Sequence, residues 1–113
     1  MAEDCLFCRI ARQEISVPLV YDADGCIAFR DINPQAPTHI LVVPREHIRS
    51  LNDATDAAVI GRLSLAAAQI AKKEGIAASG YRTVMNTNRD GGQTVFHIHL
   101  HLLGGRRLAW PPG

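Results

Sequence analysis

The spacing of hydrophobic residues separates predicted helices from predicted strands along this chain. Leu6, Phe7 and Ile10 fall on one helical face, so a short amphipathic helix is predicted over residues 5–14. Apolar residues recur at spacings of three and four between residues 55 and 74, which predicts a long helix that Gly75 ends. The apolar positions of this second helix are Val59, Ile60, Leu63, Ala67 and Ile70.

Short apolar or alternating runs predict five strands. The first two flank Asp24-Gly25, a pair typical of a hairpin turn, and two prolines in residues 33–37 predict a loop. One long helix, one short helix and no regular β-α-β alternation favour an α+β domain with a mostly antiparallel sheet. The predicted strands cover residues 17–22, 26–31, 39–44, 81–87 and 94–103.

Length and composition indicate an ordinary folded domain. The chain has 113 residues, so we expect one domain over residues 1–113; 47% of them are hydrophobic and 20% charged. No apolar run approaches the roughly 20 residues that a membrane-spanning helix needs, so no membrane partner is expected. The first four residues do not resemble a secretory signal, which predicts a cytoplasmic protein.

The charge balance limits the classes of binding partner that are expected. Twelve basic and 11 acidic residues leave a formal net charge of +1, and no basic run occurs. A nucleic-acid groove depends on concentrated positive charge, so nucleic acid is not an expected partner. A small nucleotide needs only a few donors and remains compatible with this balance.

Three of the five histidines fall in one short window. His97, His99 and His101 alternate with apolar residues, so on a strand the three imidazoles share one face. Crowded imidazoles disfavour one another's protonation, and a neutral ring can act as nucleophile, general base or metal ligand. The alternatives are a half-exposed strand with a polar face and a three-histidine zinc site.

A glycine-rich segment precedes this window. Gly91 and Gly92 permit positive φ angles, at which successive N–H groups converge on an anion, and Thr94 adds a hydroxyl donor. Most Gly-Gly pairs are only hairpin turns. Beside three histidines, this segment predicts a phosphate cradle.

Residues 97–103 fit the H-x-H-x-H-x-x signature of the histidine-triad (HIT) nucleotide hydrolases and transferases. The segments 31–39, 91–93 and 110–113 resemble the Hint branch of that superfamily, and the resemblance covers essentially the whole chain. It implies a HIT-like fold and a purine nucleoside phosphoramidase. Such an enzyme hydrolyses the P–N bond of adenosine or guanosine 5′-phosphoramidates to the nucleoside monophosphate and an amine.

The resemblance also implies roles for four histidines. His99 is the expected nucleophile, which forms a covalent nucleotidyl-histidine. His101 contacts the phosphate oxygens and the leaving group, His39 helps to orient the other rings, and His97 supports the strand. Which imidazole protonates the leaving amine stays open.

Further residues are assigned to nucleotide binding by the same resemblance. Asp31 is expected to accept hydrogen bonds from the ribose hydroxyls. The residues expected near the phosphate or ribose are Asn86, Gly92, Gln93 and Thr94. Those expected to form an apolar slot for the purine are Phe7, Ile10, Phe29, Ile32 and Leu41, for each of which simple core packing is the alternative.

The C-terminal tail, about residues 104–113, carries Trp110 followed by two prolines. The resemblance implies a homodimer whose sheets join, with Trp110 near the partner's nucleotide site. An exposed, frayed tail is the alternative.

Cys5 and Cys8 have the C-x-x-C spacing of metal ligands. Other branches of the superfamily bind a structural zinc at positions that correspond here to Cys5, Cys8, His47 and His97. The alternative is two partly buried cysteines and a solvated histidine; Cys26 is interpreted as core packing. No cofactor is expected to be required for catalysis.

Two other functions compete with the phosphoramidase. One is a nucleotide-binding regulatory module that acts through a protein partner. The other is a dinucleoside polyphosphate hydrolase or nucleotidylyltransferase of a sister branch, against which the Hint-like tail argues.

Overall fold

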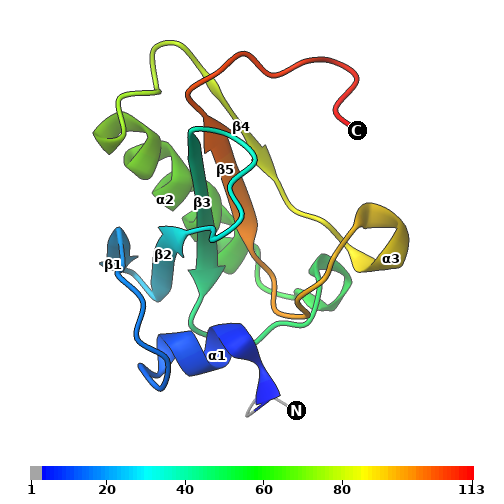
Figure 1. Cartoon of the computed structure of the whole chain (residues 1–113). Coiled ribbons are helices and arrows are strands. Elements are labelled where there is room, and N and C mark those ends of the chain that lie inside the picture. The colour runs from blue at the N-terminus through cyan, green and yellow to red at the C-terminus, as the bar shows by residue number, and fades with distance from the viewer. Residues whose placement is uncertain (1–3) are drawn as a thin grey trace.

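A computed structural model describes residues 4–113 of the chain (Figure 1). Its centre is one antiparallel sheet with the strand order β1-β2-β3-β5-β4. The strands are β1 (Tyr21–Ala23), β2 (Cys26–Arg30), β3 (Thr38–Pro44), β4 (Tyr81–Val84) and β5 (Leu100–Gly104). The helices are α1 (Leu6–Ala11), α2 (Ala57–Lys73) and α3 (Asn88–Gly91), with a 3-10 turn at Leu51–Asp53. The predicted α+β class is confirmed.

The two faces of the sheet bury different helices. Alternate residues of β2 and β3, such as Ala28 and Val42, point to the face that α2 covers. Their neighbours Ile27 and Leu41 point to the opposite face, which α1 covers (Figure 1). Every residue of β3 is buried, because this strand is covered on both sides.

Helix α2 lies within its predicted range of residues 55–74 and begins two residues later than predicted, at Ala57. The Asp56 side chain accepts a hydrogen bond from the Ala58 amide at 2.9 Å and caps the N-terminus. Lys72 and Lys73 lie in the last turn, where cations favour the helix dipole, and Gly75 adopts a φ of 76°. The apolar stripe of α2 packs on the sheet together with Cys26, whose predicted place in the core is confirmed.

Three predicted strands are shorter by three or more residues in the structure. Of the predicted strand 17–22, only Tyr21 and Asp22 belong to β1, which continues to Ala23; the Val20 amide also donates to the Ala28 carbonyl, and Pro18 has no amide hydrogen to extend the ladder. The predicted strand 81–87 ends at Val84. Residues 88–91, for which no helix was predicted, form the short helix α3, which ends at Gly92 with a φ of 87°.

The strand predicted over residues 94–103 begins only at Leu100. The register of β3 with β5 pairs Val42 with Leu100, so a longer ladder would bring Pro44 opposite Ile98. Pro44 lacks an amide hydrogen, and its carbonyl oxygen accepts a hydrogen bond from the His97 ring at 2.7 Å instead. The ladder therefore stops, and residues 94–99 run as an irregular segment.

Across residues 4–113, no helix is long and apolar enough to span a bilayer.

Candidate active site

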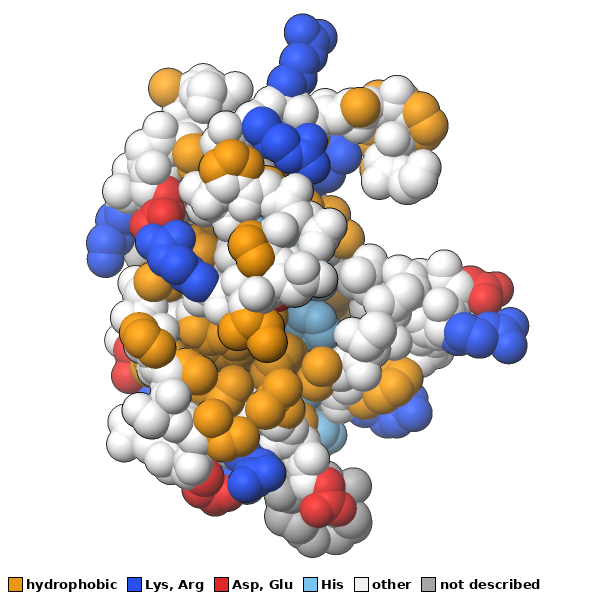
Figure 2. Space-filling model, viewed as in Figure 1, with side chains coloured by type: hydrophobic (Ala, Val, Ile, Leu, Met, Phe, Trp, Pro, Cys, Tyr) orange, Lys and Arg blue, Asp and Glu red, His pale blue; other side chains and the backbone are white. Residues whose placement is uncertain are grey.

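A cleft of about 380 Å³ opens beside α1, between the C-terminal end of β2 and the middle of β3. Figure 2 shows hydrophobic side chains gathered on this side of the molecule, with histidine side chains next to them. The lining is mostly apolar and ends at two imidazoles. The lining residues are Leu6, Phe7, Ile10, Ile15, Val17, Phe29, Arg30, Asp31, Ile32, Leu41, Thr94, Val95, His99 and His101.

All five residues predicted to form a purine slot line this cleft. Phe7 and Phe29 meet edge to face with their ring centroids 5.5 Å apart, and both rings are buried. Ile10 and Leu41 are also buried, whereas Ile32 is fully exposed at the rim. The cleft thus has four buried apolar side chains along its base and one exposed apolar side chain, Ile32, at its rim.

Hydrogen bonding fixes the tautomer of His99. Its Nδ1 lies 2.8 Å from the carbonyl oxygen of His97. A carbonyl can only accept, so Nδ1 donates, and in the neutral ring the lone pair belongs to Nε2. Burial lowers the pKa of His99, which favours this neutral form, although the hydrogen bond to His97 opposes the shift.

A second chain of hydrogen bonds fixes the tautomers of His39 and His101. The backbone N–H of Gln35 donates to Nδ1 of His39 at 3.0 Å, so the proton of neutral His39 is on Nε2. That Nε2 lies 2.9 Å from Nδ1 of His101, which must therefore accept. The proton of His101 is then on its own Nε2.

Asp31 completes this group. One of its carboxylate oxygens lies 3.4 Å from Nε2 of His39, and the other accepts the Asn33 amide at 2.8 Å. Burial lowers the pKa of His39, against the opposing effect of Asp31, and lowers the pKa of His101 to about 4. His99 and His101 lie side by side with ring centroids 5.0 Å apart. One ring therefore has a lone pair, and its neighbour has an N–H donor.

The side chains of His97 and His99 point to the same side of their segment, because the Phe7 ring contacts both imidazoles. Ile98, Leu100 and Leu102 point the other way into the core, as their alternation predicts. The His97 ring, however, is fully buried and does not line the cleft. The alternative of a zinc held by His97, His99 and His101 is wrong for the described residues, in which these three imidazoles do not form one donor group.

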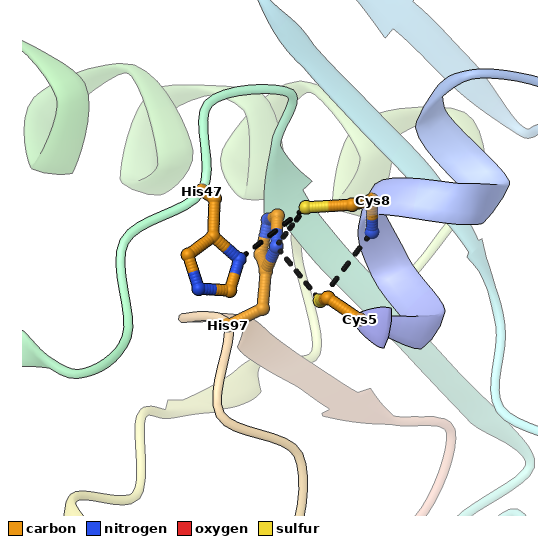
Figure 3. Close-up of side chains that lie close together, drawn as sticks. All are labelled: Cys5, Cys8, His47 and His97. Atoms are coloured by element: carbon orange, nitrogen blue, oxygen red, sulfur yellow. Dashed lines mark hydrogen bonds between the residues drawn. The ribbon is translucent and has the colours of Figure 1, made fainter. Parts of the chain in front are cut away.

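His97 instead meets three other predicted zinc ligands (Figure 3). Its Nδ1 lies 3.4 Å from Sγ of Cys5 and 3.5 Å from Sγ of Cys8, and Nδ1 of His47 lies 3.3 Å from Sγ of Cys8. The four donor atoms all lie within 4.8 Å of one another. We call Cys5, Cys8, His47 and His97 the Cys/His cluster.

The Cys/His cluster fits a tetrahedral zinc. Zinc–sulfur and zinc–nitrogen bonds of about 2.3 and 2.0 Å place neighbouring ligand atoms about 3.5 Å apart, close to the spacings found here. Nε2 of His97 donates to the Pro44 carbonyl, which leaves the Nδ1 lone pair directed at the two thiols. A backbone carbonyl that orients a ligating histidine in this way is usual at zinc sites.

The glycine-rich segment differs in part from its predicted form. Gly92 has a positive φ, whereas Gly91 belongs to α3. The Gln93 side chain is buried: its nitrogen donates to the Arg49 and Val95 carbonyls, and its oxygen accepts the Asn88 amide. Gln93 therefore braces this segment from inside, and Thr94 is the predicted phosphate contact that lines the cleft.

Two other predicted residues lie apart from the cleft lining. Asn86 is half-buried in the segment between β4 and α3. Trp110 is 81% exposed on the tail, with the Arg82 guanidinium 5.9 Å from its ring centroid. Sequence reasoning missed Arg30 and the apolar Leu6, Ile15, Val17 and Val95 as lining residues. For the apolar four, the available signal was their position within or next to the predicted helix and strands.

The family comparison bears directly on these groups. The HIT domain family model matches residues 12–108, which include His39, His99 and His101. The chain belongs to the HIT family. The matched range does not include Cys5 and Cys8, so the cysteine half of the Cys/His cluster lies outside it.

HIT relatives resemble the chain over nearly its full length. The purine nucleoside phosphoramidase of Escherichia coli is 56% identical over 96% of this chain and 92% of its own. A HIT-like protein of Synechococcus elongatus is 55% identical over the whole of both chains. The crystal structure of a HIT family hydrolase from Legionella pneumophila superposes with a TM-score of 0.93 at 50% identity, covering 96% of this chain and 99% of its own.

Proposed function

We propose that this HIT protein hydrolyses the P–N bond of purine nucleoside 5′-phosphoramidates. The observation that carries the proposal is the pair of opposed tautomers at the end of the apolar cleft. His99 presents an Nε2 lone pair, and His101 presents an Nε2–H donor beside it. The relative from E. coli named for this activity supports the choice of substrate class.

The cleft suits a purine nucleotide. An apolar slot between Phe7, Phe29 and Leu41 matches the flat, weakly polar face of a purine ring. Asp31 lies between this slot and the histidines, and its carboxylate can accept the ribose hydroxyls. With the base and ribose so placed, the α-phosphorus reaches His99. Asn86, Gly92 and Thr94 are the proposed contacts of the phosphate oxygens.

The reaction proceeds in two displacements. Nε2 of His99 attacks phosphorus with its lone pair, a P–N bond to the imidazole forms, and the P–N bond to the amine breaks. The departing nitrogen takes a proton from Nε2 of His101 after this ring has taken up a solvent proton, so that His101 returns to the neutral form rather than becoming an anion; His101 then takes a proton from the attacking water. The water oxygen replaces the imidazole on phosphorus, which releases the nucleoside monophosphate and restores His99.

The test is AMP release from an adenosine 5′-phosphoramidate that carries an alkylamine leaving group. Wild type is expected to release AMP, and His99→Ala is expected to lose at least about 10⁴-fold in kcat. The variant should still bind AMP within a few-fold of wild type, which shows that the cleft is intact. A wild type that binds AMP but cleaves no P–N substrate would favour the regulatory binding module.

A structural zinc in the Cys/His cluster is the second part of the proposal. Two thiolates and two imidazoles form a donor set that zinc prefers, and with all four positions filled by protein no site remains for a catalytic water. The metal would hold together α1 and the segments around His47 and His97. Metal analysis of purified protein should find one zinc per chain, and Cys8→Ser should lose it.

We also propose a cytoplasmic homodimer with joined sheets. The three cysteines are free thiols, which suits a reducing compartment. Trp110 is the largest exposed hydrophobic side chain of the tail, and burial against a partner near its nucleotide site would remove it from water. Light scattering should give twice the chain mass, and AMP should change Trp110 fluorescence.

A further inference from the structure

We infer that metal binding in the Cys/His cluster and nucleotide binding in the cleft strengthen each other. The coupling runs through α1 and through His97, each of which belongs to both places. This inference rests on the proposed function and adds a control of substrate affinity by the metal. Its physical basis is that binding of either ligand restricts the same two parts of the chain, α1 and the segment around His97.

Helix α1 and its N-cap residue contribute side chains to both sites. Cys5 caps its N-terminus and Cys8 follows one turn later, and both thiols belong to the cluster. Phe7 and Ile10 of the same helix form part of the cleft wall. A metal that fixes the two thiols therefore also fixes the wall against which the purine packs.

Besides the apolar packing of Phe7 and Ile10, this helix has different polar contacts at its two ends. It has only six residues, and isolated helices of this length are not stable in water. At its C-terminal end, the Arg45 guanidinium donates to the Ala11 carbonyl at 2.6 Å and also pairs with Asp22. At its N-terminal end, the polar contacts seen among residues 4–113 include those of the thiols with His47 and His97. The metal would replace these weak contacts with bonds.

His97 provides the second route. Its ring belongs to the cluster, and its carbonyl oxygen accepts Nδ1–H of His99. Residue 97 lies outside the sheet ladder, so its position depends on its ring and on the hydrogen bond from the Ile98 amide to the Ile48 carbonyl. A bond between the metal and the His97 ring would restrict the motion of the His97 carbonyl, whose hydrogen bond orients His99 toward the cleft.

If binding at one site changes the affinity at the other, the effect must be reciprocal. If zinc raises the affinity for AMP by some factor, AMP raises the affinity for zinc by the same factor. We expect a factor of at least about five, the lower end of usual coupling between sites. A zinc that merely stabilised the fold at a distance would leave the affinity for AMP unchanged.

The experiment measures both affinities on the full chain, with no turnover. AMP is titrated by calorimetry into protein stripped by a chelator, and into the same protein reloaded with one equivalent of Zn²⁺. Zinc affinity is measured by competition with a chromophoric chelator, with and without saturating AMP. Far-UV circular dichroism of the stripped protein checks that its secondary structure is retained.

A pair of variants isolates the metal as the cause. His47→Ala removes one cluster ligand that does not line the cleft, and it should bind AMP with the weaker affinity of stripped wild type whether or not Zn²⁺ is added. Glu46→Ala alters the exposed neighbouring residue and should keep the wild-type coupling.

The outcomes separate this inference from the proposed function. Mutual strengthening of matching size supports the inference. Equal AMP affinities in stripped and loaded protein overturn it and leave the phosphoramidase proposal standing. Failure of Zn²⁺ to bind overturns both the zinc proposal and the coupling. Failure of AMP to bind the loaded wild type overturns the proposed function itself, and the coupling with it.

Discussion

His97 and His99 are two residues apart, both are buried, and they differ in which ring nitrogen is used. His99 donates from Nδ1 to a backbone carbonyl, so its Nε2 lone pair faces the cleft. His97 donates from Nε2 to the Pro44 carbonyl, so its Nδ1 lone pair faces two thiols. The residue type is the same, and the partner of one ring nitrogen decides where the lone pair of the other points: into the cleft, as the proposed nucleophile needs, or toward the thiols, as the proposed metal ligand needs.

The largest effect that should distinguish the two groups comes from the cleft. His101→Ala removes the N–H donor beside His99, so kcat should fall by about 10²–10⁴, the usual contribution of a general acid. Steady-state AMP release measures the loss. A phosphoramidate whose leaving group needs no proton should recover much of the rate. A variant that is equally slow with both kinds of leaving group would contradict the role of His101 as donor.

The Cys/His cluster should respond in stability rather than in chemistry. Chelation of zinc should lower the free energy of unfolding by about 4 kcal/mol if free zinc exceeds its Kd 1,000-fold. Urea unfolding of stripped and loaded wild type measures the difference, and added zinc should leave Cys8→Ser unchanged. Identical midpoints for stripped and loaded wild type would contradict a structural metal.

Acid should weaken the fold through the cleft histidines. Burial holds the pKa of His101 at about 4, below the 6.5 of an exposed ring, so the unfolded state takes up the proton first as the pH falls. Stability is therefore fully present above pH 6.5 and declines between pH 6.5 and 4, by about 3 kcal/mol for His101 alone. In His101→Gln this part of the pH dependence should disappear. An unchanged slope would contradict the lowered pKa of His101.

The smallest effect is expected at Asp31. Asp31→Asn keeps the shape but weakens the acceptor for the ribose hydroxyls, so kcat/KM should fall about tenfold for an adenosine phosphoramidate. A 2′,3′-dideoxy substrate, which lacks those hydroxyls, should show little difference between wild type and variant. An equal loss on both substrates would assign Asp31 to the support of His39 instead.

The sequence predicted the faces of the molecule better than the lengths of its elements. Alternation placed Ile98, Leu100 and Leu102 in the core correctly, because a period of two survives even where the ladder stops. The early end of that ladder depends on Pro44, which lies in a different strand, so residues 94–103 alone could not reveal it. The helix at Asn88–Gly91 was missed for a related reason, since Gln93 supports it from a buried position.

The candidate site shows the same limit. The histidine window could be predicted from the chain and the apolar slot from its resemblance to the HIT family, and the purine-slot residues do line one cleft. The tautomers could not be read, because they depend on the carbonyls of Pro44 and His97 and on the amide of Gln35. Gln93 was expected at the nucleotide, and only the fold shows its side chain turned inward.

The most direct test of the account is to find the covalent intermediate and its position. Wild type is mixed with an adenosine phosphoramidate, quenched in alkali within one turnover and analysed by mass spectrometry after digestion. The account predicts an adenylyl group on the peptide that contains residues 97–101, attached to His99, and its absence in His99→Ala. An adduct on His97 or His101, or full turnover by His99→Ala, would contradict the assignment of the nucleophile.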